Sequence, residues 1–194
     1  MANRASKGSA FEREICKRLS LWWTQDEPEP QDDVFWRTSN SGGRATVRSR
    51  KGKRTRQHHG DVCAVDERGR PFTDLVTIEL KRGYNRATLQ DLLDKPDGAA
   101  EQTHEAWLRK ARENSEAAGS YSWLLIVKRD KREPLVLMDG DLFWKCELAN
   151  APALVFPGGK VCKEIHVHAI KSFLAGVKPS TIKKLARACW AAWE

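Results

Sequence analysis

Apolar residues recur at steps of three or four in three stretches of the chain, residues 6–23, 102–118 and 180–193. This spacing places the apolar side chains on one face of a helix. Gly119 follows the second stretch and is typical of a helix end. In the first stretch the apolar positions are Phe11, Ile15, Leu19 and Trp22. We therefore expect three amphipathic helices, and a short helical turn over 88–93.

Short runs rich in β-branched and other apolar residues predict strands between these helices. They cover 62–65, 75–81, 121–127, 134–138 and 165–170. The first two runs are joined by 66–70, which contains Gly69 and is typical of a hairpin turn. The resulting order, αββαβ followed by further C-terminal elements, predicts an α/β fold.

Composition narrows the class of protein. The 194 residues are 40% apolar and 31% charged, which is typical of one globular domain, or one domain with a tail, and excludes a disordered or collagen-like chain. The sequence contains no apolar run of about 18 residues and no apolar signal segment near its start, so we expect a cytoplasmic protein without a membrane partner. The odd number of cysteines, 5, favours free thiols over a disulfide framework.

Positive charge is concentrated in one segment of the chain. The net charge is +8, and no acidic residue occurs between Val34 and Gly60. This basic loop, residues 37–60, predicts contacts with the phosphates of DNA; the alternative is a solvated arm without a ligand. The residues expected to contact DNA are Arg37, Ser39, Ser41, Arg44, Arg48, Arg50, Lys51, Lys53, Arg54, Arg56, His58 and His59.

Acidic residues follow this loop in a pattern that suggests a metal site. Side chains alternate along a strand, so Glu79 and Lys81 share one face of the predicted strand 75–81. A hairpin centred near Arg70 sets Asp61 opposite Glu79, with Cβ atoms about 5 Å apart. Two carboxylates at that separation can share one divalent cation. The alternative is that Glu79 and Lys81 form an ordinary surface ion pair.

Glu12 supplies a third candidate carboxylate. Because successive helical residues are about 100° apart, Glu12 falls within the apolar arc of the first helix, whereas Glu14 faces away from it. A carboxylate directed at the core is costly unless it is paired, hydrogen-bonded or metal-bound. The alternative is a capping box, in which Glu12 is the partner of Ser9 at the start of the helix.

Five motifs follow one another along the chain: KGSAFERE (7–14), GD (60–61), IELK (78–81), QTHEAWLRKA (102–111) and YSWLLIVK (121–128). In this order they resemble the PD-(D/E)xK nuclease superfamily, and within it archaeal Holliday-junction resolvases and related phage nucleases. The resemblance covers roughly residues 7–138 and implies an αβββαβ-type core with a central mixed sheet flanked by helices. The C-terminal strand and helix are expected from the sequence pattern and have no counterpart in the resemblance. We expect a core over 1–140, with an insertion at 84–101, and an extension over 141–194 packed on the core.

The resemblance also implies a function and a set of site residues. Glu12, Asp61, Glu79 and Lys81 form the implied catalytic set of a Mg²⁺-dependent endonuclease that hydrolyses DNA phosphodiester bonds, with selectivity for branched DNA. Asp61, Glu79, the carbonyl of Leu80 and Glu12 through a water would hold Mg²⁺, with Mn²⁺ as a substitute. Lys81 would orient or deprotonate the attacking water. Gln102 is a further candidate, and a homodimer is implied by analogy with resolvases.

Two other functions remain open at this point. The chain would be a non-enzymatic nucleic-acid-binding protein if the basic loop binds nucleic acid and the acidic residues form only surface ion pairs. It would be a restriction-type endonuclease if cleavage has a sequence preference. A separate group, Cys162, His166 and His168, has ligand spacing for zinc, although alternate residues on a strand favour structural histidines. Trp36, beside the basic loop, is the one tryptophan that we expect to be available for base stacking.

Overall fold

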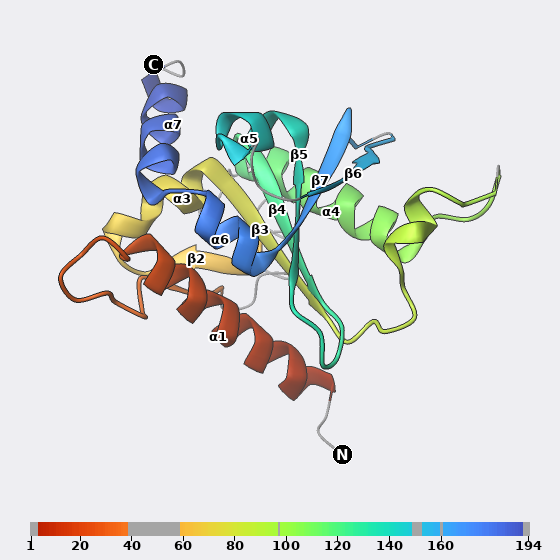
Figure 1. Cartoon of the computed structure of the whole chain (residues 1–194), viewed down its shortest axis with the longest axis horizontal. Coiled ribbons are helices and arrows are strands. Elements are labelled where there is room, and N and C mark those ends of the chain that lie inside the picture. The colour runs from red at the N-terminus through yellow and green to blue at the C-terminus, as the bar shows by residue number, and fades with distance from the viewer. Residues whose placement is uncertain (1–3, 39–58, 97, 149–152, 160, 192–194) are drawn as a thin grey trace, which may run out of the picture.

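The computed structural model describes residues 4–38, 59–96, 98–148, 153–159 and 161–191. A five-stranded mixed sheet forms its centre, with strand order β3-β4-β5-β7-β6, and a two-stranded sheet β1-β2 lies beside it (Figure 1). The helices are α1 (Arg4–Trp23), α3 (Arg70–Leu75), α4 (Thr103–Ala118), α5 (Gly140–Lys145), α6 (Ile170–Gly176) and α7 (Pro179–Ala191), with 3-10 turns η1 (Glu67–Gly69) and η2 (Leu89–Leu92). The strands are β1 (Phe35–Arg37), β2 (Val62–Ala64), β3 (Val76–Arg82), β4 (Ser122–Lys128), β5 (Leu135–Asp139), β6 (Leu154–Pro157) and β7 (Glu164–Ala169).

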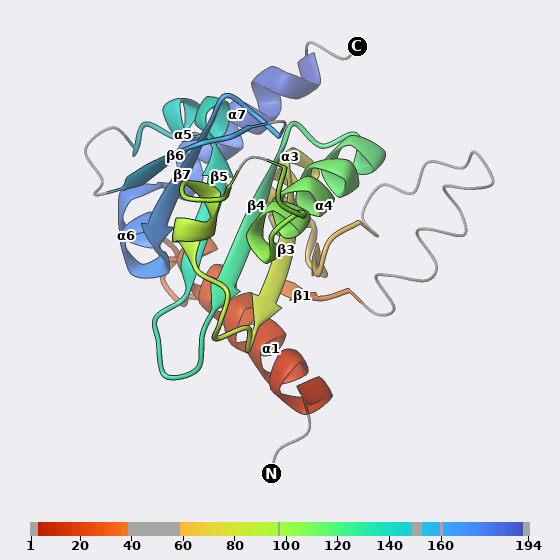
Figure 2. The ribbon, with the colours of Figure 1, turned by 90° about the vertical axis from the view of Figure 1, so that its right-hand side faces the viewer.

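The central sheet is covered by helices on both faces. Strands β3 and β4 are parallel, and the other neighbouring pairs are antiparallel. Helix α1 packs on the face that carries Ile78 and Leu80, whereas α4 packs on the face that carries Leu125, so the two helices lie on opposite sides (Figures 1 and 2). The predicted α/β class, with a mixed sheet flanked by helices, is confirmed.

The three predicted helices correspond to α1, α4 and α7, and the predicted turn over 88–93 to η2. Gly119 ends α4 with a positive φ of 69°, as expected for a helix C-cap. The capping box at Ser9 is wrong. Because α1 already begins at Arg4, Ser9 lies inside the helix, where its Oγ accepts a hydrogen bond from Arg37.

The predicted hairpin between 62–65 and 75–81 is also wrong. Strand β2 pairs with β1 instead, and the expected turn region forms η1 and α3. The physical reason is Phe72, which contacts the rings of Trp22, Trp23 and Phe35 at centroid distances of 5.4 to 5.7 Å. A tight hairpin would leave this apolar segment without a partner, whereas a helical turn buries it.

The C-terminal segment continues the same sheet. Strand β7 pairs with β5, and β6 pairs with β7. Helix α7 packs against α3, and the indole Nε1 of Trp22 donates to the carbonyl of Val177 at 2.9 Å. Residues on both sides of position 140 thus contribute to one sheet, and the division into a core and an extension at this position stays a prediction. Among the helices of the described part, none has the length and apolar character needed to cross a membrane.

The aromatic cluster around α3 leads to a stability prediction. Replacing Phe72 by Ala removes a fully buried ring, so we expect a loss of about 3 to 5 kcal/mol in the free energy of unfolding. Chemical denaturation measures this loss. Val65→Ala serves as the control, because Val65 is 61% exposed and its truncation should change stability by only about 0.5 kcal/mol. Equal stability of both variants would contradict the packing described here.

Candidate active site

Strand β3 carries alternating residues to the two faces of the sheet. Val76, Ile78 and Leu80 belong to the core on the α1 side, so Thr77, Glu79 and Lys81 point to the side covered by α4. Glu79 is only 5% exposed, which is unusual for a carboxylate. The strand therefore positions one acidic and one basic side chain together beneath a helix, as the sequence predicts.

Asp61 is held against the open edge of β3 by two hydrogen bonds. Its backbone N–H donates to the carbonyl of Ile78 at 2.7 Å, and its Oδ2 accepts from the N–H of Leu80 at 2.8 Å. These two backbone groups flank Glu79. The predicted proximity of Asp61 and Glu79 is therefore present in the structure, although it arises from this two-point contact and not from the predicted hairpin.

Gly60 permits the close approach of Asp61. Its φ is +84°, a conformation that L side chains rarely adopt, and a Cβ at this position would lie 2.7 Å from the carbonyl oxygen of Ile78. Any other residue would meet both a backbone strain and a steric contact here. The GD motif is thus a structural requirement as well as a chemical one.

Lys81 joins the two carboxylates. Its Nζ lies 3.0 Å from Glu79 Oε2 and 3.8 Å from Asp61 Oδ2. Burial disfavours the charged form of Lys81, but the carboxylates of Glu79 and Asp61 outweigh this effect, so the pKa of Lys81 is raised. One positive charge therefore sits where two negative charges converge.

Asn114 of α4 completes the contacts of Glu79, and it is a residue that our sequence analysis missed. Its Nδ2 donates to Glu79 Oε1 at 2.6 Å, so both oxygens of the buried carboxylate are engaged. A signal was present, because Asn114 follows Ala111 by three residues and thus continues the apolar face of the helix with a polar group. Gln102, the predicted candidate on this helix, lies 12 residues earlier, about 18 Å along the axis, and its side chain bonds to Ala100.

Glu12 is paired with Arg37 of β1, whose guanidinium nitrogen lies 3.5 Å from Glu12 Oε2. The next residue, Thr38, donates its backbone N–H to the carbonyl of Asp61 at 3.0 Å, so Arg37 and Thr38 connect the two acids. Burial raises the pKa of Cys16 on α1 to about 12, and Cys63, Glu12 and Asp61 add to the effect. Glu14, which we expect to face away, instead contacts Lys128 at 2.8 Å. Both acids of α1 are therefore partly buried.

Most of the predicted DNA-contacting residues lie outside the described residues. These are Ser39, Ser41, Arg44, Arg48, Arg50, Lys51, Lys53, Arg54, Arg56 and His58. Arg37 is described and holds Ser9 and Glu12, while Trp36 beside it is 45% exposed. His59, two residues before Asp61 in the chain, lines a cavity of about 30 Å³ with Cys63, Thr77 and Trp190.

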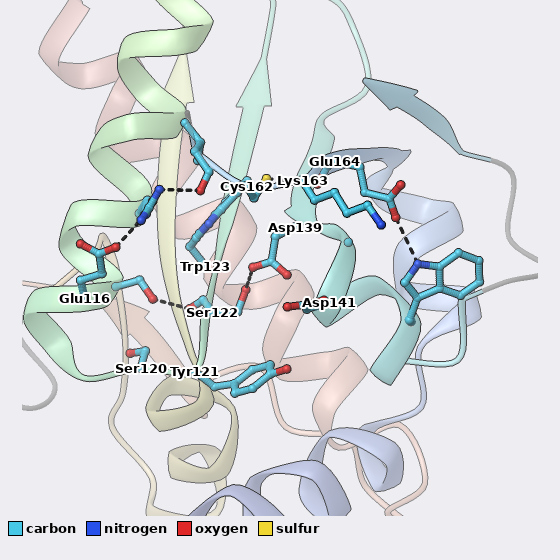
Figure 3. A pocket seen from close by; sticks show the side chains of 15 residues that line it. Glu116, Ser120, Tyr121, Ser122, Trp123, Asp139, Asp141, Cys162, Lys163 and Glu164 are labelled. Carbon is cyan, nitrogen blue, oxygen red and sulfur yellow. Dashed lines mark hydrogen bonds and ion pairs between the residues drawn. The ribbon is translucent and has the colours of Figure 1, made fainter. Parts of the chain in front are cut away.

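A second polar pocket, of about 360 Å³, lies between α4 and α5 (Figure 3). Asp139 and Ser122 point toward one another there, and Glu164 accepts a hydrogen bond from the indole of Trp144. Cys162 also lines this pocket and donates to the carbonyl of Glu164. Its predicted zinc partner His166 stacks on Phe143 with centroids 3.7 Å apart. In the described part of the chain, no three His, Cys, Asp or Glu side chains are grouped to hold a metal ion.

With this arrangement of fold and side chains in view, comparison with known proteins identifies the family. The chain belongs to the PD-(D/E)xK nucleases, as a member of the family described as "Phage putative PDDEXK endonuclease", whose sequence model matches residues 3–182. The match includes the segment after residue 140. No curated protein and no solved structure gives a significant match. A closer relationship to Holliday-junction resolvases stays a prediction.

The role of Gly60 can be tested with a matched glycine. Gly60→Ala should lower the free energy of unfolding by about 2 kcal/mol or more, because strain and the contact with Ile78 act together. Gly119→Ala is the control: its φ is also positive, but no atom lies within 4 Å of the added Cβ, so a smaller loss of about 1 kcal/mol is expected. Urea denaturation compares the two. Similar losses would show that the contact of Gly60 with β3 has no energetic role.

Proposed function

We propose that this protein is a Mg²⁺-dependent endonuclease that hydrolyses phosphodiester bonds in DNA. Membership of a PD-(D/E)xK endonuclease family suggests nuclease activity. The observation that carries the proposal is the convergence of the Asp61 and Glu79 carboxylates on the single ammonium group of Lys81. Two acidic residues that are distant in sequence are seldom brought together in a partly buried place unless they have a functional role.

The donor set fits a hard divalent cation. Asp61 and Glu79 offer only oxygen ligands, which Mg²⁺ prefers, and their oxygens already face one common cation, the Lys81 ammonium. The carbonyl of Leu80 follows Glu79 directly in the strand and is the third ligand in our proposal. Glu12, paired with Arg37, would act through a water if it takes part. Mn²⁺ has the same ligand preference and would substitute.

Each residue of the site then has a role in hydrolysis. A bound Mg²⁺ would neutralise charge on the scissile phosphate and on the leaving 3′ oxygen. Asp61 and Glu79 would hold this Mg²⁺ at a fixed place, because both carboxylates are held by backbone or side-chain hydrogen bonds. Lys81 orients the attacking water and stabilises negative charge that develops on the phosphate. Asn114 acts as a positioning residue through Glu79.

The catalytic roles predict two inactive variants. Glu79→Gln and Lys81→Met should each reduce the cleavage of supercoiled and branched DNA by at least about 100-fold, because each removes a charge at the reacting phosphate. Cleavage by the wild type should require Mg²⁺ and stop with EDTA. Glu113→Gln and Lys110→Met on α4 are controls of the same chemistry at exposed positions, and they should retain activity.

The same assay separates the alternative functions. A protein that binds DNA without cutting it would give no products with Mg²⁺, and this outcome would contradict the proposal. Discrete fragments from linear DNA would indicate a restriction-type preference, whereas cuts confined to a branch point would indicate structure selectivity. Sedimentation of the free protein tests the homodimer that the resemblance implies.

The positioning role of Asn114 predicts a change in the Mg²⁺ dependence of activity, which general damage to the fold would not cause. Asn114→Ala leaves Glu79 Oε1 without its donor, so we expect a 10- to 100-fold loss of activity, as is typical for partners of metal ligands. The loss should be largest at low Mg²⁺ and should shrink as Mg²⁺ is raised. Glu113→Ala, the neighbouring exposed residue, is the control. An identical Mg²⁺ dependence in wild type and Asn114→Ala would rule out the positioning role.

A further inference from the structure

Lys81 also lines a cleft of about 700 Å³, to which the proposed hydrolysis assigns no role. Residues of the segment that carries η2, of helix α4 and of the connection from β4 to β5 line it. Figure 2 shows the course of these elements. This volume is within the range of small-ligand sites. Because Lys81 lines it, a group bound in the cleft would lie beside the scissile phosphate.

Aromatic side chains form one wall of this cleft. Tyr84 and Trp107 meet edge to face, with ring centroids 4.7 Å apart, and His104 also contacts Trp107, with centroids 5.0 Å apart. Tyr84 is 53% exposed, so much of its ring is open to solvent. Tyr84 and Lys81 line the same cleft. The exposed ring of Tyr84 is therefore available for stacking in the same cleft as Lys81.

Arg129 and Arg132 also line the cleft, and within the described ranges no ion pair closer than 4 Å involves either arginine. Lys128 lines the cleft as well, but its ammonium is paired with Glu14 of α1 at 2.8 Å. Glu133, the acidic residue that lines the cleft, is already paired with Arg18 at 2.9 Å. Arginines without partners beside an exposed ring are the combination that binds single-stranded nucleic acid, with the base on the ring and the phosphate on the guanidinium.

We infer that this cleft, which we call the Tyr84 cleft, binds one unpaired nucleotide of the DNA substrate next to the scissile phosphate. In a duplex both faces of every base are covered by neighbouring bases, so the Tyr84 ring can stack only on a base that has left the helix. The substrate class is therefore DNA with an unpaired nucleotide at a branch, flap or end. This inference rests on the proposed nuclease function for the position of the phosphate, but the cleft is tested by binding alone.

The test compares two DNAs that contain the fluorescent base 2-aminopurine. One is a duplex with a flap whose first unpaired base is 2-aminopurine, and the other has the same base fully paired. With the full chain in EDTA, the flap should bind about tenfold more tightly than the duplex, and its fluorescence should fall as the base stacks. Tyr84→Leu should abolish most of this tenfold ratio, whereas Tyr84→Phe, which keeps the ring, should preserve it.

Two further variants separate the cleft from general effects. Trp144→Ala removes a 59% exposed ring from the other pocket and should leave the ratio unchanged. Arg132→Gln should lower the slope of log affinity against log salt for the flap by roughly 0.7, as expected for one phosphate contact on a single strand. Circular dichroism verifies that each variant is folded.

The outcomes are distinct for the two proposals. Equal binding of flap and duplex by the wild type, no binding of either, or an unchanged ratio in Tyr84→Leu would each overturn the Tyr84 cleft. A retained flap preference without any cleavage in Mg²⁺ would instead contradict the nuclease function and leave the cleft standing. Cleavage in Mg²⁺ without a flap preference would support the nuclease function and overturn the Tyr84 cleft.

Discussion

The structure depends on the way in which a short segment covers the open edge of β3. An edge strand carries unpaired N–H and C=O groups that need partners. Asp61 satisfies the two that flank Glu79, one with its backbone and one with its carboxylate. The same contact completes the sheet edge and brings two acids of the site together. The same pair of hydrogen bonds therefore stabilises the sheet edge and positions Asp61 beside Glu79. Gly60 permits these bonds because it has a positive φ and no Cβ.

The parts of the fold that could be predicted are those with a strong periodic pattern. The apolar stripe of α1, the continuous run of β4 and the alternation of β3 led to the right elements, because each pattern reports burial directly. The hairpin failed because Gly69 and its neighbours are compatible with both a turn and a helix start. Phe72 decides between them through ring contacts that no local pattern encodes.

The sequence predicted which residues form the candidate site better than it predicted which residues contact them. Glu79 and Lys81 had to share a face, since they are two residues apart on a strand. The approach of Asp61 was predicted from a hairpin register that does not exist, so the right proximity came from the wrong connection. The contact of Asn114 with Glu79 and the pairing of Glu12 with Arg37 depend on tertiary packing between elements, which a single sequence does not report.

Helix α4 bears both the amide that fixes Glu79 and the indole that supports Tyr84. Trp107 and Asn114 are seven residues apart on one rigid rod, so about 10 Å of helical rise separates them. Residues 84 to 93 contribute to the lining of the Tyr84 cleft, whereas the side-chain contacts described for Glu79 come from Lys81 and Asn114. A change of composition in that segment therefore need not alter the geometry of the carboxylates.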